Sequence, residues 1–285
     1  MPRSVRYTLF HLILLLTLAL VPAAAHAAGL WVTTDKGYKV WDEQAFSDHI
    51  VTWTGQADPE GYATGKGILR WYTLSHNPLY KYEGEMRKGK RDGKGTLTYE
   101  TSGASFTGLW RSDKMNGYGV WITETGDRYE GNWVNGFQHG KGKIIWTSGD
   151  RYEGDWVKGE RTGKGVFTWA NGDRFAGDLV SGARTGKGVY TWANGDRYEG
   201  EFKNNELNGK GVYLWITGAR YEGGFFKDKR HGKGTLKWPN GDRYEGEWAN
   251  GAMHGYGTIY YANGAVQKGR WANGKYIGEK ANKAK

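Results

Sequence analysis

An aromatic residue that opens a short Glu-Gly or related segment returns every 23 residues through most of this chain. The starts in constant step are Tyr129, Tyr152, Phe175, Tyr198, Tyr221 and Tyr244. The series extends upstream to Phe106 and, after one step of 24 residues, to Tyr82, and downstream to Gln267. A period of this size is typical of stacked copies of one small unit. It favours a binding surface or a scaffold over an enzyme with a single catalytic cleft.

Each repeat has the pattern of two short strands. In the module that begins at Phe175, alternate residues as far as Leu179 are apolar or glycine, and this period of two predicts a first strand. A second alternating segment, from Gly186 to Trp192, predicts a second strand. The connections between them are short, so neighbouring strands must run antiparallel.

Both connections carry residues that suit turns. The module ends in Asn194-Gly195, and this pair predicts a tight hairpin turn because both residues accept positive φ. The turn inside each module carries Gly, Asn or Asp at one fixed position, and these residue types tolerate a left-handed backbone. The fixed positions are Gly89, Asp113, Gly136, Gly159, Gly182, Asn205, Asp228, Gly251 and Gly274.

The two faces of such a sheet differ. One face carries aromatic residues and glycines, and the glycines allow each ring to lie over an adjacent strand. The other face carries mixed charges, such as Glu153 and Lys164, that can pair across strands. Two strands per module advance the sheet by about 10 Å, so ten or so modules give roughly 90–100 Å. The predicted fold class is all-β: a single elongated twisted antiparallel sheet of stacked 23-residue β-hairpins, in which neighbouring modules supply the burial.

The repeat resembles the MORN (membrane occupation and recognition nexus) family. The segment GDRYEGDWVKGERTGKGVFTWANGDR, residues 149–174, agrees nearly throughout with the family pattern YEGxWxxGxxxGxGxxxWxxGDR, and the resemblance covers about residues 80–275. The resemblance implies binding of phospholipids or proteins, because such arrays are attached to lipid-kinase, lipid-transfer and junctional scaffold proteins. Some bacterial members are labelled as lipid kinases, but the repeats leave this chain no room for a kinase domain.

The first 27 residues have the pattern of a secretory signal peptide. Arg3 and Arg6 form a positive end, residues 9–21 are mostly apolar, and residues 25–27 fit the A-x-A cleavage rule. The apolar stretch is short for a membrane span of about 20 residues, so an uncleaved anchor is the alternative interpretation. Cleavage would remove two of the charges that make up the formal net charge of +10. We therefore expect a bacterial secreted member of the family, located in the periplasm or outside the cell.

The sequence divides into four parts. They are a signal peptide (1–27), an N-terminal cap with a degenerate first repeat (28–81), the repeat array (82–277) and a basic C-terminal tail (278–285). Trp53, Gly55 and the pair Gly65 and Gly67 mark the degenerate repeat. A cap is expected because an open sheet end invites association, and end-to-end pairing of two copies is the alternative.

The aromatic face is the first candidate binding surface. Its rings could contact a protein partner or stack on the sugar rings of an envelope polysaccharide. The competing interpretation is that the rings are used up by packing on the glycines, and the exposure of the second-strand tryptophans decides between the two. The candidates are Tyr129, Trp133, Trp146, Tyr152, Trp156, Trp169, Trp192, Tyr198, Trp215, Tyr221, Trp238, Tyr244 and Trp248.

Basic clusters at hairpin tips are the second candidate surface, for an anionic membrane. The alternative interpretation is that they are solvated tips without a ligand. Lipid binding through the tips predicts salt-sensitive association, whereas protein binding through the aromatic face predicts weak salt dependence. The candidates are Arg87, Lys88, Lys90, Arg91, Lys227, Lys229 and Arg230.

We expect no catalytic site, no cofactor, no metal and no nucleic-acid partner. The chain has no Cys, which excludes Cys nucleophiles and Cys-based zinc sites. His231 and His254 hold the same position one module apart, about 10 Å, which is too far to share a metal ion. An enzyme hidden in the irregular segment 31–81 would have to use residues that no spacing pairs, and these are Asp35, Asp42, Glu43, His49 and His76.

The sequence thus predicts a non-enzymatic binding or scaffold protein of the cell envelope. It would contact either a protein partner or an anionic lipid surface. Glycan or cell-wall binding through the aromatic face is the alternative.

Overall fold

The computed structural model describes residues 29–42 and 49–279. The predicted signal peptide, Glu43 and residues 280–285 lie outside the described residues. All regular secondary structure in the described part is β-strand. The strands are β1 (Leu30–Thr33), β2 (Lys39–Asp42), β3 (His49–Trp53), β4 (Gln56–Ala57), β5 (Ala63–Thr73), β6 (Pro78–Arg87), β7 (Lys90–Tyr99), β8 (Ser105–Arg111), β9 (Lys114–Ile122), β10 (Arg128–Val134), β11 (Phe137–Ile145), β12 (Arg151–Val157), β13 (Glu160–Thr168), β14 (Arg174–Val180), β15 (Ala183–Thr191), β16 (Arg197–Lys203), β17 (Glu206–Leu214), β18 (Arg220–Phe226), β19 (Lys229–Lys237), β20 (Arg243–Ala249), β21 (Ala252–Tyr260), β22 (Val266–Ala272) and β23 (Lys275–Gly278).

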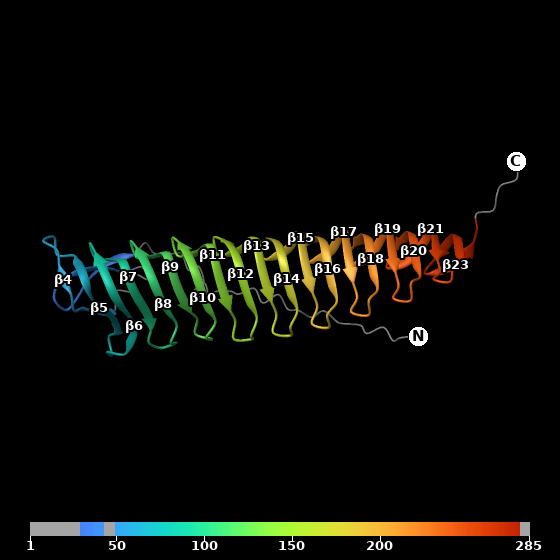
Figure 1. The fold of residues 1–285 in the computed structure, drawn as a ribbon. Coiled ribbons are helices and arrows are strands. Elements are labelled where there is room, and N and C mark those ends of the chain that lie inside the picture. The colour runs from blue at the N-terminus through green and yellow to red at the C-terminus, as the bar shows by residue number, and fades with distance from the viewer. Residues whose placement is uncertain (1–28, 43–48, 280–285) are drawn as a thin grey trace.

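Strands β3 to β23 form one long antiparallel sheet in sequence order. β12, for example, pairs with β11 on one side and β13 on the other. At the ends, β3 and β4 both pair with β5, and β23 pairs with β22. No pairing among the described residues joins these two ends, so the sheet is open, and Figure 1 shows its strands side by side along an elongated molecule. The predicted fold class is confirmed. Within the described ranges, no helix is long and apolar enough to cross a membrane.

The turn inside each module contains two left-handed residues. In the turn between β12 and β13 these are Lys158, with φ of 50°, and Gly159, with φ of 85°. All nine predicted positions have positive φ, from 63° at Asp228 to 86° at Gly136, so this prediction is confirmed. Two successive left-handed residues form the type I′ turn, whose twist matches that of the flanking strands. We call these connections the short turns.

The connection between modules is a longer loop than the Asn-Gly pair predicted. At Asn194-Gly195 the glycine alone has positive φ, 93°. The N–H of Trp192 donates to the carbonyl of Asp196 at 2.9 Å, which encloses three residues of loop. The Asn acts through its side chain instead, because its Oδ1 accepts a hydrogen bond from the N–H of Asp196 at 2.9 Å. We call these connections the long loops.

Rings from the first strands form a continuous core along the aromatic face. Tyr152 is buried and meets the ring of Trp156 edge-on at 5.4 Å, and Trp156 in turn meets Tyr129 of the preceding module at 5.1 Å. These edge-to-face contacts link each module to the next. The polar atoms of the rings are paired, since Tyr152 Oη donates to the carbonyl of Asp155 at 3.0 Å and Trp156 Nε1 to that of Gly142 at 3.2 Å.

Glycines leave the space that these rings occupy. Gly154 and Gly165 face each other across β12 and β13, and the ring of Tyr152 lies over both. A Cβ atom on Gly154 would lie 2.5 Å from Tyr152 Oη, so no larger residue fits there. The predicted packing of rings on glycines is confirmed. The ladder shifts register between Gly154 and Trp156, and a bulge of this kind bends the strand.

The polar face carries charge pairs across neighbouring strands. Lys141 Nζ lies 2.6 Å from Asp155 Oδ1, and Lys164 Nζ lies 2.8 Å from Asp178 Oδ1. The hydrogen bond from Lys164 holds the pKa of Asp178 below its usual range. Exposed pairs of this kind contribute little stability each. The packing that holds the modules together therefore lies on the aromatic face.

The N-terminal hairpin β1–β2 packs on the first modules. Its Trp41 N–H donates to the carbonyl of Gly89, in the short turn between β6 and β7, at 2.8 Å. Lys90 Nζ lies 4.5 Å from the ring centroid of Trp41. The N–H of Asp35 donates to the carbonyl of Val51 on β3 at 3.1 Å. The segment predicted as an N-terminal cap thus contains a hairpin that contacts the first strand of the long sheet.

Candidate binding site on the aromatic face

The structure divides the thirteen predicted rings into two rows. The eight rings of the first row lie on first strands and are at most 5% exposed, and they are Tyr129, Trp133, Tyr152, Trp156, Tyr198, Tyr221, Tyr244 and Trp248. Rings so deeply buried expose almost no surface, and they pack against one another and against the glycines. The second row lies at the ends of the second strands and is half-buried, and it contains Trp146, Trp169, Trp192, Trp215 and Trp238.

Tilted contacts between neighbouring rings close the second row in the centre of the array. Trp169 lies 4.3 Å from Phe167 and 5.4 Å from Tyr190, measured between ring centroids. Trp192 lies 4.6 Å from Tyr190 and 5.0 Å from Tyr213. Each of these tryptophans has an aromatic neighbour on either side. A sugar stacks on a free ring face, whereas the faces of these rings are covered by neighbouring rings.

Arginine side chains fill the space between the two rows. The guanidinium carbon of Arg184 lies 4.9 Å from the ring centroid of Tyr190, and Nη2 donates to the carbonyl of Asn205 at 2.7 Å. Burial lowers the pKa of Arg184 below its usual range. Arg161 and Arg230 hold the equivalent position in two other modules, each over rings of both rows.

The basic candidates also fall into two groups, one that packs against rings and one that is exposed. Arg91 and Arg230 pack over tryptophan rings at 4.4 and 4.2 Å, and Lys90 packs over the tryptophan of the N-terminal hairpin. These three side chains therefore take part in packing. The exposed candidates are Arg87, Lys88, Lys227 and Lys229. They lie at two short turns, β6–β7 and β18–β19, and the ten strands from β8 to β17 separate these two hairpins in the sheet order.

A hollow of about 480 Å³ opens on the aromatic face near the C-terminal end of the array. We call it the Trp238 hollow. An apolar concavity of this size with a few polar groups is the usual form of a ligand site. Its lining residues are Trp238, Pro239, Asn240, Asp242, Met253, Ile259 and Tyr261.

The hollow exists because the two modules that form it, residues 221–243 and 244–266, carry smaller side chains than the central ones. Met253 stands at the position that Arg184 holds, so no guanidinium bridges the two rows there. Leu236 and Ile259 stand where the central modules have Phe or Tyr. Within the described residues, the ring of Trp238 consequently has neither a stacked ring nor a cation against it. Trp238 is thus the second-row tryptophan whose ring is open to a ligand.

The long loops beside the hollow also depart from the repeat. In the central modules an Asp of one loop accepts a hydrogen bond from a main-chain N–H of the next, as Asp196 Oδ1 does from Ile216 at 2.8 Å. The same bond joins three earlier pairs of loops. At the next step the Asp is replaced by Ala219, and the facing residue is Pro239, which has no N–H to donate. The acceptor and the donor of this hydrogen bond are therefore both missing at the same step. We call the series of loop-to-loop hydrogen bonds the loop ladder, and it is interrupted at the hollow.

The family model for the MORN repeat matches eight segments of the chain. They are residues 82–103, 106–128, 129–151, 152–174, 175–197, 198–220, 221–243 and 244–266. This chain belongs to the MORN repeat family. MORN repeats are consistent with a binding or scaffold role. No curated protein matches the sequence.

Solved structures resemble this MORN array only loosely. The TCP10 domain of Danio rerio CPAP is 9% identical, with a TM-score of 0.38 over 72% of this chain and 89% of that one. The TCP domain of Drosophila melanogaster SAS-4, in complex with a proline-rich motif of Ana2, is 8% identical, with a TM-score of 0.35 over 54% and 84%. A streptogramin B lyase is 14% identical, with a TM-score of 0.17 over 86% and 77%. Scores this low carry no argument about the MORN array.

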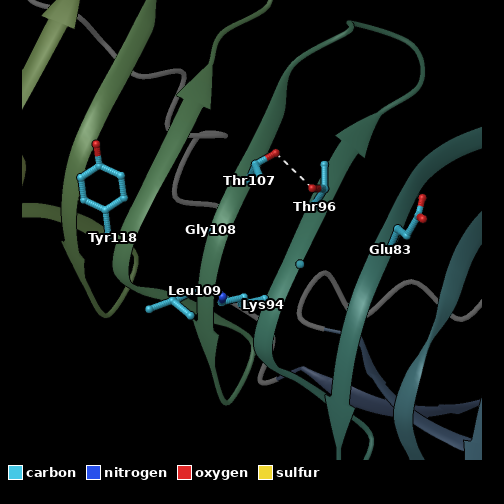
Figure 2. A pocket seen from close by; sticks show the side chains of 8 residues that line it. Glu83, Lys94, Thr96, Thr107, Gly108, Leu109 and Tyr118 are labelled. Carbon is cyan, nitrogen blue, oxygen red and sulfur yellow. Dashed lines mark hydrogen bonds between the residues drawn. The ribbon is translucent and has the colours of Figure 1, made fainter.

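A second hollow, also of about 480 Å³, lies on the polar face of the MORN array between β6 and β9. Figure 2 shows its side chains spread over four strands rather than converging on one point. Thr96 and Thr107 are joined at 3.0 Å between their Oγ1 atoms. Leu109 stands opposite Lys94, at a position where Asp155, Asp178 and three glutamates stand in other modules. With no converging groups, this surface is a weaker candidate than the Trp238 hollow.

The residues proposed for a hidden active site do not converge. Asp42 Oδ2 lies 3.5 Å from His49 Nδ1, and the side chain of Asp42 is buried. Asp35 and His76 are exposed. In residues 29–42 and 49–279, no group of three His, Asp or Glu side chains is placed to hold a metal ion.

Proposed function

We propose that this MORN array is a non-enzymatic scaffold of the cell envelope that binds a protein partner by holding an apolar side chain in the Trp238 hollow. The observation that carries the proposal is the unstacked ring of Trp238 inside an apolar concavity. In a repeat protein, packing explains a feature that every module shares. A feature confined to one pair of neighbouring modules, together with the interrupted loops beside it, points to a ligand instead.

The chemistry of the hollow fits an apolar side chain of a protein. Met253 is a flexible, polarisable side chain that adapts to irregular shapes. Trp238 and Tyr261 are of the residue types enriched at protein interfaces. The polar side of the hollow is held in place, because Asp242 Oδ1 accepts the N–H of Ala262 at 2.8 Å.

Anionic lipid and glycan have less support. The exposed basic candidates form two small clusters far apart in the sheet order, whereas a membrane surface is contacted best by a continuous basic patch. The central tryptophans pack at a tilt against neighbouring rings on both sides, which leaves a glycan chain no row of free ring faces.

The envelope location rests on the predicted signal peptide. Cleavage after Ala27 is expected to leave a mature protein that begins at Ala28. Sequencing the N-terminus of the protein recovered from the envelope fraction tests this expectation. A protein that keeps its first residues would support the uncleaved anchor.

Site-specific photo-crosslinking in the native cell tests the binding site. Benzoylphenylalanine replaces Tyr261 in the hollow or, as the matched control, Tyr256 on the polar face, and the two tyrosines are similarly exposed, at 36% and 42%. Irradiation is expected to give a protein adduct of defined mass from position 261 and none of that mass from position 256. The substitution Met253→Arg should abolish this adduct, because the side chain that other modules carry at this position fills the hollow.

Two results would contradict the proposal. One is the absence of a protein adduct at position 261, and the other is an adduct that Met253→Arg leaves unchanged. Sedimentation with neutral and anionic liposomes at two salt concentrations separates the lipid alternative. Salt-sensitive pelleting that is lost on changing Lys227 and Lys229 to Glu, and kept in Met253→Arg, would assign the binding to the basic tips.

A further inference from the structure

The hairpin of β8 and β9 lacks charge at three module positions where the polar face is usually charged. Thr107 holds a position at which six other modules carry Glu, and Tyr118 holds one at which six carry Lys. Leu109 holds a position that is acidic in five. No other module of the array is neutral at all three positions. These side chains line the hollow between β6 and β9, which we call the Tyr118 hollow, and their joint departure from the repeat points to a ligand there.

The ring of Tyr118 presents a free face in this hollow. Figure 2 looks into the hollow and shows the ring face-on. The side chain is 53% exposed, and within residues 29–42 and 49–279 no other ring packs against it. Its hydroxyl donates a hydrogen bond to the carboxylate of Glu130 on β10, which fixes the orientation of the ring. An oriented ring with a negative π face is a platform on which the C–H face of a sugar ring can stack.

A pair of threonine hydroxyls lies in the same hollow. The Oγ1 atoms of Thr96 and Thr107 are joined at 3.0 Å across neighbouring strands. This bond uses one of the two hydroxyl protons, and no described residue accepts the other. Adjacent hydroxyls of a pyranose ring are separated by a similar distance, so the pair can donate to one and accept from the next. An apolar side chain of a protein placed over the pair would instead leave a hydroxyl without a partner.

The ring and the hydroxyl pair are diagonal neighbours on the sheet. Thr107 pairs with Val120, and Tyr118 stands two residues before Val120 on the same face of β9. Diagonal neighbours of this kind are about 7–8 Å apart. One sugar ring cannot contact both groups, whereas two linked rings can. The spread of the side chains over four strands therefore suits an extended ligand.

We propose that the Tyr118 hollow binds a neutral oligosaccharide of two or more pyranose rings, with one ring stacked on Tyr118 and the hydroxyls of the next bonded to Thr96 and Thr107. The loss of the usual charges agrees with such a ligand. Charged side chains at these positions would pair across the strands and cover the surface, as Lys164 and Asp178 do elsewhere.

This site is independent of the proposed function. It lies on the polar face in the module at residues 106–128, whereas the Trp238 hollow lies on the aromatic face in the modules at residues 221–266. It also differs from the glycan alternative that the sequence predicts for the aromatic face, because it needs one free ring rather than a row of them. Loss of either site should therefore leave the other intact.

Saturation-transfer NMR of the protein recovered from the cells that make it tests the proposal. The probes are cellohexaose, chitohexaose and maltohexaose, with glucose and N-acetylglucosamine as single-ring controls. At least one hexaose is expected to bind, with the strongest transfer at the C–H protons of one sugar face. The single rings should bind much more weakly, because one ring cannot reach both the platform and the hydroxyl pair.

Variants that follow the repeat identify the site. Tyr118→Lys should raise the dissociation constant of the bound hexaose by about tenfold or more, because it removes the platform. Thr107→Val should raise it by about threefold to tenfold, the effect of one lost hydrogen bond. Tyr256→Lys is the matched control, since Tyr256 holds the same module position but faces Arg270, and it should leave binding unchanged. Six modules carry Lys at this position, so both Lys variants are expected to fold, and thermal unfolding checks this.

Three results would overturn the proposal. One is that no hexaose binds at concentrations up to about 10 mM. Another is a hexaose that binds Tyr118→Lys as well as it binds the wild-type protein, which would assign the sugar to another surface. The third is a protein adduct of one defined mass from benzoylphenylalanine at position 118 that Leu109→Asp abolishes, which would assign the hollow to a protein partner.

Discussion

The central modules of this array and the two modules that form the Trp238 hollow, residues 221–243 and 244–266, share one backbone and differ in what fills their aromatic face. Tyr198 and Tyr244 are equally buried in the first row. In the second row Trp192 stands between two tyrosine rings, whereas Trp238 stands in a hollow. The first row and the glycines determine the backbone, so the second row is free to vary without altering the fold. This freedom allows two neighbouring modules of a uniform array to form a site that the other modules lack.

Alkaline pH is expected to unfold both regions of the array together, and this is the largest of the predicted effects on stability. Burial raises the pKa of Tyr152, Tyr221 and Tyr244 to about 12 from the usual 10.0. A raised pKa means that the folded state favours the neutral ring, so the stability is intact below pH 10 and is lost as the pH rises through 12. Circular dichroism and tyrosinate absorbance, followed together against pH, should show ionisation and unfolding as one transition.

The control for this titration comes from the chain itself. Phe106 and Phe175 hold the same first-row position, so Tyr152→Phe and Tyr244→Phe are expected to fold. Each should move the unfolding transition to higher pH. A transition that one variant moves and the other does not would mean that the two regions unfold separately.

Truncating a first-row ring should lower the free energy of unfolding by the same amount in either region. Tyr198→Ala and Tyr244→Ala each remove a fully buried ring with two edge-on ring contacts. Each should lower the free energy of unfolding by about 3–5 kcal/mol, the usual cost of deleting a buried aromatic side chain. Urea unfolding measures both. A clearly smaller loss for Tyr244→Ala would show that the regions differ in their first row as well.

Truncating a second-row ring should lower the free energy of unfolding more in the central modules than at the Trp238 hollow. Trp192 makes two ring contacts, and Trp238 makes none among the described residues. Ring pairs contribute about 0.5–1.5 kcal/mol each, so Trp192→Ala should lower the free energy of unfolding by about 1–3 kcal/mol more than Trp238→Ala. Equal losses measured by urea unfolding would contradict the view that Trp238 is reserved for a ligand.

Restoring the missing hydrogen bond of the loop ladder should give the smallest change in stability. Ala219→Asp alone is expected to bring no gain, because Pro239 has no N–H to donate. Together with Pro239→Ala, the Asp can accept the hydrogen bond that joins the other loops, which contributes about 0.5–1.5 kcal/mol. A double-mutant cycle in thermal unfolding measures this coupling. Simple additivity of the two substitutions would mean that the ladder does not re-form.

The backbone could be predicted from the sequence because steric demands recur at fixed module positions. Asp113, Asn205 and Asp228 occupy a column of glycines and are left-handed like them. The separation into two rows could not be predicted in this way, because the rings of both rows alternate with the same period of two. Tyr198 and Trp192 look equivalent in the sequence, yet one is fully buried and the other is half-buried.

The Trp238 hollow was missed because Trp238 itself obeys the repeat. The signal lies in its neighbours, where Met253 replaces an arginine and Pro239 faces Ala219. A comparison of each column of the repeat for the module that departs from it would have found the site. The basic clusters could not be resolved from the sequence for a related reason, since Lys229 and Arg230 are adjacent in sequence but belong to opposite faces of the sheet.

Every short turn is joined to the module before it by the same bond, as the N–H of Gly182 is to the carbonyl of Arg161 at 2.8 Å. The joint recurs at Gly159 and Gly251 with other partners, so it does not depend on which two modules it connects. Whole modules can therefore be duplicated or deleted without a new junction having to be invented. Each one changes the length by about 10 Å. The number of modules therefore sets the distance between the N-terminal hairpin and the Trp238 hollow.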